Sequence, residues 1–148
     1  MSMRTFVFLI LNFFQALLVF AQVQTSVPGP VLEVFQKEYP DAVNASWSVE
    51  KNAFKVFFVT GDQHRHINYY DSEGKVIRKE NEIQSVDIPT SVRLYFQDNF
   101  PDVRNYSVWA VEDREGNIKY YSSYDNQVIF FDKTGIISKD IPDTINAH

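Results

Sequence analysis

The chain has 148 residues and carries 14 Lys and Arg against 19 Asp and Glu, which gives a formal net charge of −5. This acidic balance, without a basic run, argues against a nucleic-acid-binding surface, which needs clustered Lys and Arg. The sequence contains no Cys, so disulfides, thiol catalysis, Cys-based zinc sites and a lipid-modified cysteine are excluded. The 13 Phe, 8 Tyr and 2 Trp can supply much of the buried area that a small domain needs.

The first 21 residues have the pattern of a secretory signal peptide, with one positive charge, an apolar run and small residues before a cleavage site after Ala21. A membrane anchor is the alternative. The run from Phe6 to Ala21 is shorter than the about 20 residues of a spanning helix and is interrupted by Asn12 and Gln15. We therefore expect cleavage, a mature chain that begins at Gln22, and no stable membrane insertion afterwards.

One phrase occurs twice, as FQKEYPD at 35–41 and as FQDNFPD at 96–102, at an offset of 61 residues. Nine identities share this offset: Pro28 with Pro89, Val31 with Val92, Phe35 with Phe96, Gln36 with Gln97, Pro40 with Pro101, Asp41 with Asp102, Ser46 with Ser107, Asp71 with Asp132 and Gly74 with Gly135. The pattern indicates two copies of one supersecondary unit. We assign residues 1–21 to the signal peptide, 22–84 to the first unit, 85–140 to the second, and 141–148 to a C-terminal cap or tail.

Each unit begins with the apolar period of a helix. Val31, Val34, Phe35 and Tyr39 lie at i, i+3, i+4 and i+8, and the same stripe recurs in the second unit at Val92, Tyr95, Phe96 and Phe100. A proline stands near the first turn of each predicted helix, and another proline ends it. The repeated phrase is therefore predicted to be the last turn of a helix and its stop signal.

Short segments rich in aromatic and β-branched residues follow each helix and are separated by turn residues. The expected strands are 47–50, 54–60, 65–70 and 76–78 in the first unit, and 108–112, 118–124, 127–131 and 136–139 in the second. We predict an α+β fold of two tandem helix-plus-antiparallel-meander units that form one larger sheet with both helices on one face.

A family resemblance rests on the tandem Pro-x-x-Val-x-x-x-Phe-x-x-x-(Tyr/Phe)-Pro-Asp unit, the Trp that follows it and the Asp-x-x-Gly that closes the meander. These features, spread over 27–139, resemble the PepSY-like, β-lactamase-inhibitor-like proteins exported by Bacteroides-type bacteria. The resemblance implies a sheet with the helices packed on its convex side. One departure is that Trp47 follows Pro40 by seven residues whereas Trp109 follows Pro101 by eight, so we expect the second Trp to face the other way.

In the true inhibitors of this fold, turns that project from the concave side enter the active site of the enzyme, and an acidic group imitates the substrate. The nearest counterparts in this chain are Glu50 in the first unit and Asp113 and Glu115 in the second. Acidic turns are ordinary on any protein surface, so inhibition is an inference by analogy.

Catalytic constellations are weak in this sequence. His64 and His66 lie at i and i+2, a spacing that metals can use, but no third ligand is specified, and a solvated pair at a strand end is the simpler interpretation. There is no Gly-x-Ser-x-Gly elbow. The carboxylate pairs Glu80 with Glu82 and Asp113 with Glu115 are better explained as solvated turns than as acid and base. We expect no enzymatic activity, no cofactor and no metal.

Adjacent aromatic pairs occur in four of the predicted strands: Phe57-Phe58, Tyr69-Tyr70, Tyr120-Tyr121 and Phe130-Phe131. Neighbours in a strand point to opposite faces, so one ring of each pair serves the core and the other the open face. The candidate binding residues on this face are Tyr70, Tyr121, Tyr124 and Trp109. The alternative is that the sheet is curled or paired in a dimer and hides these rings.

The sequence thus favours an exported, periplasmic or secreted, non-enzymatic binding module that engages a protein or peptide of the cell envelope through its open aromatic sheet face. The competing hypothesis is a proteinaceous inhibitor of a β-lactamase or a peptidase.

Overall fold

The computed structural model describes residues 26–124 and 127–138. The expected signal peptide at 1–21 and the expected cap at 141–148 lie outside the described residues. The elements are α2 (Gly29–Glu38), β1 (Val43–Glu50), β2 (Ala53–Val59), β3 (Arg65–Tyr70), β4 (Val76–Ile83), α3 (Thr90–Asn99), β5 (Ser107–Asp113), β6 (Ile118–Tyr124) and β7 (Gln127–Phe131).

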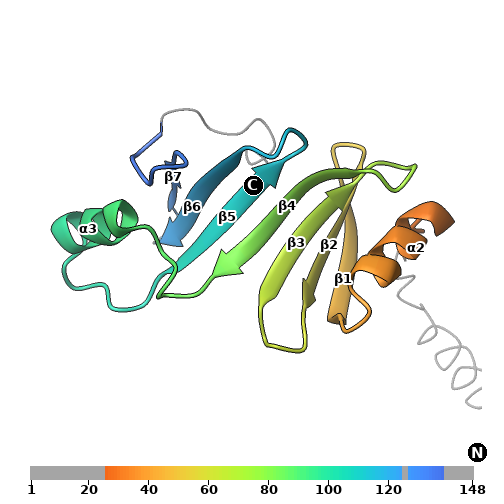
Figure 1. Ribbon diagram of the computed structural model, residues 1–148, viewed down its shortest axis with the longest axis horizontal. Coiled ribbons are helices and arrows are strands. Elements are labelled where there is room, and N and C mark those ends of the chain that lie inside the picture. The colour runs from red at the N-terminus through yellow and green to blue at the C-terminus, as the bar shows by residue number, and fades with distance from the viewer. Residues whose placement is uncertain (1–25, 125–126, 139–148) are drawn as a thin grey trace, which may run out of the picture.

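The seven strands form one antiparallel sheet in chain order, and β4 pairs with β5 to join the two meanders. Figure 1 shows α2 and α3 near opposite ends of this sheet. Helix α2 packs on Val56 and Phe58 of β2, and α3 packs on Val108 of β5 and Phe131 of β7. Residues that are paired in register share a face of the sheet, and by this register the contacts of both helices lie on the same face. The predicted fold class is therefore confirmed.

Both helices form as their sequence pattern predicts. Pro28 precedes α2 and Pro89 precedes α3, and neither contributes a side-chain cap. The N–H of Tyr39 donates to the carbonyl of Phe35 at 2.9 Å, and the N–H of Phe100 donates to that of Phe96 at 2.8 Å. The prolines at 40 and 101 then end the helices, because the residue before a proline avoids helical geometry.

Each helix covers its own hydrophobic cluster. The first cluster joins Val31 and Phe35 of α2 to Val56, Phe58 and Tyr70 of the sheet. The second joins Val92 and Phe96 of α3 to Ile88, Val108 and Phe131. Phe35 and Phe96 are the equivalent anchors, at 6% and 1% exposed, and burial of a Phe side chain contributes about 1.5–3 kcal/mol.

Three turns of the form Asp-x-x-Gly have the same hydrogen bonds. In each, one carboxylate oxygen of Asp71, Asp113 or Asp132 accepts from the N–H groups two and four residues later, over distances between 2.8 and 3.1 Å. The glycine at the fourth position has φ between 76° and 84°, a left-handed conformation that favours glycine. The offset of 61 residues between the two halves of the sequence aligned only the first and third of these turns.

Two differences from the predicted strands lie at the edges of the sheet. The eighth expected strand, 136–139, is reduced in the described part of the chain to a single bridge between Phe131 and Ile137. The first strand begins four residues early, at Val43, because a register irregularity between Val43 and Ser46 lets it keep pairing with β2. Asn44 takes φ of 56° at this point, as expected for a bulged strand.

Candidate functional site on the open face of the sheet

The open face is the side of the sheet opposite α2 and α3, and neither of these helices covers it. The register places Trp109, Tyr121 and Phe130 of β5, β6 and β7 directly beside one another on this side. We call these three residues the aromatic row. Glu82 of β4 is paired with Trp109, so Arg65, which binds Glu82, extends the row toward the first unit.

The rings of the aromatic row are in contact. Trp109 and Tyr121 lie parallel, with centroids 6.2 Å apart and an interplanar angle of 6°, and the Phe130 centroid lies 6.3 Å from that of Tyr121. The Arg65 guanidinium stands 5.8 Å from the Trp109 ring centroid, which is within the range of a cation–π interaction.

Arg65 is held in place by two partners. Its Nε and one terminal nitrogen donate to the two carboxylate oxygens of Glu82, and the same terminal nitrogen donates to the Ser107 hydroxyl at 3.2 Å. Partial burial alone would raise the pKa of Glu82, but the hydrogen bonds and the charge of Arg65 outweigh it and lower the pKa. The cation over Trp109 is therefore fixed by a bidentate ion pair.

The centre of the open face holds a buried ionic cluster. Arg78 and Glu80 are only 5% and 3% exposed and form an ion pair at 2.7 Å. The guanidinium lies 3.9 Å from the Tyr69 ring centroid, and the Tyr121 hydroxyl donates to Glu80 at 2.8 Å. Burial, followed by the negative charge of Glu80, raises the pKa of Tyr121. A buried charge persists only when it is paired and hydrogen-bonded, and this cluster fixes Tyr121 in the aromatic row.

This cluster corrects the expectation that Glu80 and Glu82 are solvated turn residues. Both lie in β4, where the strand continues past its predicted end at 78, and both carboxylates bind an arginine of the open face. Sequence reasoning missed the cluster, although Arg78, Glu80 and Glu82 alternate at i, i+2 and i+4 as residues on one face of a strand do.

Two of the expected open-face tyrosines lie on the helix side instead. Tyr70 is fully buried in the cluster under α2, and its hydroxyl accepts a hydrogen bond from Asn68 Nδ2 at 3.0 Å. Tyr124 packs on Phe100 at the end of α3, with centroids 5.1 Å apart. The assignment of these two residues to the open face was wrong. For Tyr70 the sequence did not fix which member of its pair faces the core, whereas Tyr124 lies three residues after Tyr121 in one strand and therefore faces the opposite side. Tyr69 takes the place expected of Tyr70.

The acidic candidates gather at the end of the sheet formed by the β1–β2 and β5–β6 turns. Glu50 pairs with Lys55 at 3.1 Å. The Asp113 carboxylate accepts from the N–H groups of Glu115 and Asn117 and from the Asn117 amide, and the hydrogen bonds of Asn117 lower the pKa of Asp113. Asp113 therefore builds its own turn, which leaves Glu115 as the exposed acid at the tip.

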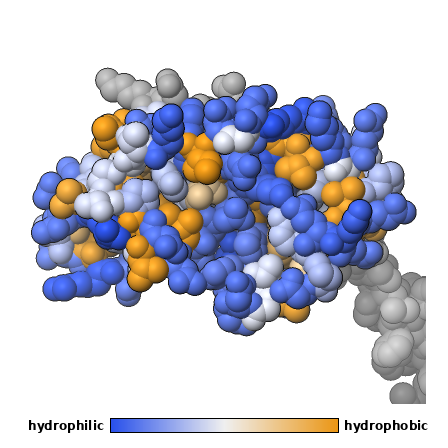
Figure 2. Space-filling view, viewed as in Figure 1, coloured by the Kyte–Doolittle hydropathy of each residue, from blue (hydrophilic) through white to orange (hydrophobic). Residues whose placement is uncertain are grey.

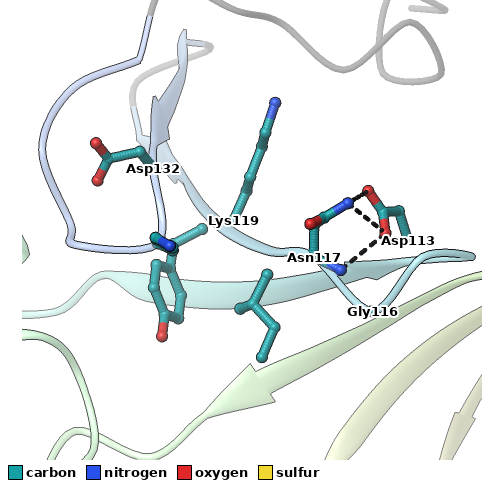
Figure 3. A pocket seen from close by; sticks show the side chains of 8 residues that line it. Asp113, Gly116, Asn117, Lys119 and Asp132 are labelled. Atoms are coloured by element: carbon teal, nitrogen blue, oxygen red, sulfur yellow. Dashed lines mark hydrogen bonds between the residues drawn. The ribbon is translucent and has the colours of Figure 1, made fainter.

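A hollow of about 670 Å³ lies beside this turn and the turn after β7. Figure 3 shows the Asp113 carboxylate directed toward Asn117, with the Lys119 side chain between Asp113 and Asp132. The Asp113 and Asp132 carboxylates each accept hydrogen bonds within their own turn. They therefore do not form a convergent pair that could exchange a proton with a substrate.

His64 and His66 both bind protein groups. His66 contacts the Asn81 amide oxygen through Nδ1 at 2.7 Å and the Thr60 hydroxyl through Nε2 at 3.0 Å, and its ring stacks on Phe58. His64 Nδ1 lies 3.1 Å from Asp62. No group of three His, Cys, Asp or Glu residues within 26–124 and 127–138 is placed to hold a metal ion.

Figure 2 shows one side of the molecule, on which hydrophobic residues form separate groups in a largely hydrophilic surface. Among the described helices, none is long and apolar enough to cross a membrane.

Comparison with known proteins places this fold among solved bacterial structures. No family model matches the chain, and no curated protein matches it. A protein of Bacteroides eggerthii that is provisionally assigned to the periplasm is 18% identical with a TM-score of 0.61, over 76% of this chain and 86% of that one. A BLIP-like protein of Bacteroides fragilis is 16% identical with a TM-score of 0.58, over 82% of this chain and 92% of that one. A DUF2874 family protein of Bacteroides ovatus is 22% identical with a TM-score of 0.57, over 77% and 86%.

The described residues therefore form two helices and a seven-stranded sheet, in the α+β fold of BLIP-like proteins. At sequence identities this low, the similarity shows a shared fold and gives no information about activity. It supports the β-lactamase-inhibitor-like part of the family resemblance, while the PepSY-like part stays an expectation. None of the three similar proteins is described as an enzyme.

Proposed function

We propose that this protein is exported to the bacterial envelope and binds a protein or peptide partner there, without catalysis, through the open face of its sheet. Two observations support export. The first 21 residues have the pattern of a cleavable signal peptide. In addition, the B. eggerthii protein with the same fold is provisionally assigned to the periplasm.

The aromatic row is the observation that carries the binding proposal. Trp, Tyr and Arg are the residue types enriched at the centres of protein interfaces, because they bury a large area and keep a polar handle. Here Trp109 and Tyr121 are held by Arg65 and Glu80 before any partner arrives. A rigid platform loses little side-chain entropy on binding, so more of its contact energy contributes to affinity.

The charges around the row argue for a polypeptide partner of mixed polarity. Three cations of the open face have carboxylate partners: Arg65 binds Glu82, Arg78 binds Glu80 and Lys55 binds Glu50, while Lys119 takes part in none of the ion pairs of the described residues. The platform therefore offers rings and hydrogen-bonding groups without a strong field of one sign. This pattern suits a peptide segment better than a polyanion or a polycation.

Inhibition of a β-lactamase or a peptidase is the second candidate, and the BLIP-like fold is the observation that favours it. Because the Asp113 carboxylate is hydrogen-bonded within its own turn, Glu115 is the acidic residue that would enter an active site. Titration of a panel of β-lactamases and peptidases with the mature chain tests this candidate, and Glu115→Gln should abolish any inhibition that is found.

The binding proposal is tested by affinity purification from envelope extract with three forms of residues 22–148. These are the wild type, the open-face variant Phe130→Ser, and the control Leu94→Ser, which removes a half-exposed side chain from α3. We expect one partner to be recovered with wild type and control and to be lost with Phe130→Ser, although all three unfold at similar temperatures. Equal recovery with both variants would contradict the proposal.

A further inference from the structure

A second hollow, of about 470 Å³, lies at the opposite end of the sheet from the Asp-x-x-Gly turns. It is bounded by the segment between β4 and α3, by the segment between α3 and β5, and by the ends of β5 and β6. Two arginines, Arg93 and Arg104, line it together with Ser85, Asn105, Ser107 and Ser123. No Asp or Glu is among its lining residues, in a chain whose net charge is −5.

The two arginines have no carboxylate partner among the residues that the structure describes. Arg93 donates one hydrogen bond, to the Thr90 hydroxyl at 3.0 Å, and Arg104 takes part in none of the ion pairs of the described residues. They differ in this respect from Arg65, Arg78 and Arg114, which each pair with an acid. A guanidinium presents five donors in a planar fork that matches an oxyanion.

The walls of this hollow are held by the core of the second unit. Tyr106 stacks on the buried Phe96, with centroids 3.9 Å apart and an interplanar angle of 11°, and this contact anchors the segment that carries Arg104 and Asn105. Ser107 is anchored on the other side, because its carbonyl accepts from the Ser122 hydroxyl at 2.7 Å. The backbone that carries these donor groups is therefore positioned by the fold, although Arg93 and Arg104 have exposed side chains, and this lowers the cost of collecting the donors around a ligand.

We propose that this hollow is a binding site for a single oxyanion group, which Arg93 and Arg104 hold by charge-assisted hydrogen bonds while neighbouring serine hydroxyls complete the coordination. The chemistry is shared by a planar carboxylate, as at a peptide C-terminus, and a tetrahedral phosphate or sulfate. The site goes beyond the proposed partner surface, since it contains no residue of the aromatic row. It nevertheless adjoins that row, because Ser107 and Ser123 lie two positions before Trp109 and two after Tyr121 in the same strands, on the same face.

The test is a titration of ¹⁵N-labelled protein with sodium acetate, phosphate and sulfate at constant ionic strength and pH, followed by amide chemical shifts. We expect at least one anion to cause saturable shifts centred on Asn105, Ser107 and Ser123. The Arg104→Gln variant should weaken binding by roughly tenfold, the size expected for loss of a charge-assisted hydrogen bond. The acetate arm and the two tetrahedral arms identify which source of oxyanion fits.

The matched control is Arg114→Gln, which removes the same charge from the β5–β6 turn, where Arg114 lies 3.7 Å from Asp71. It should bind as the wild type does. Phe130→Ser should also bind anions normally, so failure of the partner surface and failure of this site are distinguishable. Linear, unsaturable shifts with all three anions, or equal binding by Arg104→Gln and wild type, would overturn the proposal.

Discussion

Trp47 and Trp109 point to opposite faces of the same sheet. Trp47 packs edge-on against Phe35 under α2, with centroids 5.2 Å apart, while Trp109 lies on the open face parallel to Tyr121. The spacing from the preceding proline differs by one residue between the two units, and this difference predicted the reversal. In the second unit Val108 takes the position of Trp47 in the core, so the second Trp lies on the side of the open face, where it is 9% exposed.

The cation over Trp109 can be tested by fluorescence. Replacement of Trp47 by Phe leaves Trp109 as the sole indole. Adding Arg65→Ala should increase acrylamide quenching of Trp109, because the guanidinium 5.8 Å from its centroid no longer shields the ring. The control is Arg114→Ala in the same background, which should leave quenching unchanged. Equal quenching with and without Arg65 would show that the cation does not cover the ring in solution.

Two glycines of identical turn geometry should respond differently to substitution by alanine. Gly74 and Gly116 have φ of 84° and 79°, so both substitutions cost roughly 1 kcal/mol of conformational strain. A Cβ at Gly74 would also lie 2.8 Å from the Pro30 carbonyl oxygen of α2, whereas one at Gly116 meets nothing within 4 Å.

Gly74→Ala should therefore lower the free energy of unfolding by roughly 3 kcal/mol and Gly116→Ala by roughly 1 kcal/mol. Urea denaturation measures both. Similar losses at the two positions would mean that the start of α2 does not pack closely on the β3–β4 turn.

Tyr70 should make stability fall at alkaline pH. Burial raises the pKa of Tyr70 to about 12, above the value of about 10 in an unfolded chain. Between these values the unfolded state releases the proton first, so the stability contributed by the neutral phenol is present below about pH 10 and is lost toward pH 12. Tyr70→Phe should lower the free energy of unfolding at neutral pH by about 1–2 kcal/mol, because the Asn68 amide loses its hydrogen-bond acceptor. Above pH 10, however, the stability of this variant should decline less steeply than that of the wild type. Parallel curves for wild type and variant would contradict this assignment.

The Asp-x-x-Gly turns should contribute to stability against acid. Hydrogen bonds lower the pKa values of the Asp113 and Asp132 carboxyls. The largest contribution comes from the Asn117 side chain for Asp113 and from the Thr134 side chain for Asp132. Their contribution is therefore present above the unfolded value of about 3.9 and is lost as the pH falls through the lower folded values.

The double variant Asp113→Asn, Asp132→Asn keeps an acceptor oxygen in each turn but cannot titrate. Its urea midpoint should decline less than that of wild type between neutral pH and about pH 3. Asp98→Asn, on the exposed side of α3, is the control for the change in charge. An acid decline as steep in the double variant as in wild type would show that other carboxylates cause it.

The fold was predictable because the same sequence signals occur twice, at a fixed offset of 61 residues. Phe35 and Phe96 occupy equivalent core positions, and the proline after each helix ends it in the same way. The contents of the open face were harder to predict, because they depend on which residue of each aromatic pair faces that side. Tyr70 was placed on the wrong face for this reason, and Tyr124 because its odd spacing from Tyr121 in the same strand was overlooked, whereas the spacing of Trp109 gave its side correctly.

Pairing across strands explains what sequence reasoning missed. Arg78 and Glu80 look solvated in the sequence, and only the approach of Tyr69 from the adjacent β3 and of Tyr121 from β6, two strands away, shows that their charges are buried. The hollow of Arg93 and Arg104 is likewise assembled from segments that are separate in the chain. The alternation of Arg78, Glu80 and Glu82 indicates one strand face, but neither arrangement leaves a spacing that shows which side chains meet across strands.

Site-specific photocrosslinking in cells tests the central claim most directly. A benzophenone amino acid is placed at position 128 or 130 on the open face, and at position 94 on α3 as the control. The account predicts crosslinks to one envelope protein from 128 and 130 and none to that protein from 94. Crosslinks to a partner from 94 alone, or none from either open-face position, would contradict the account.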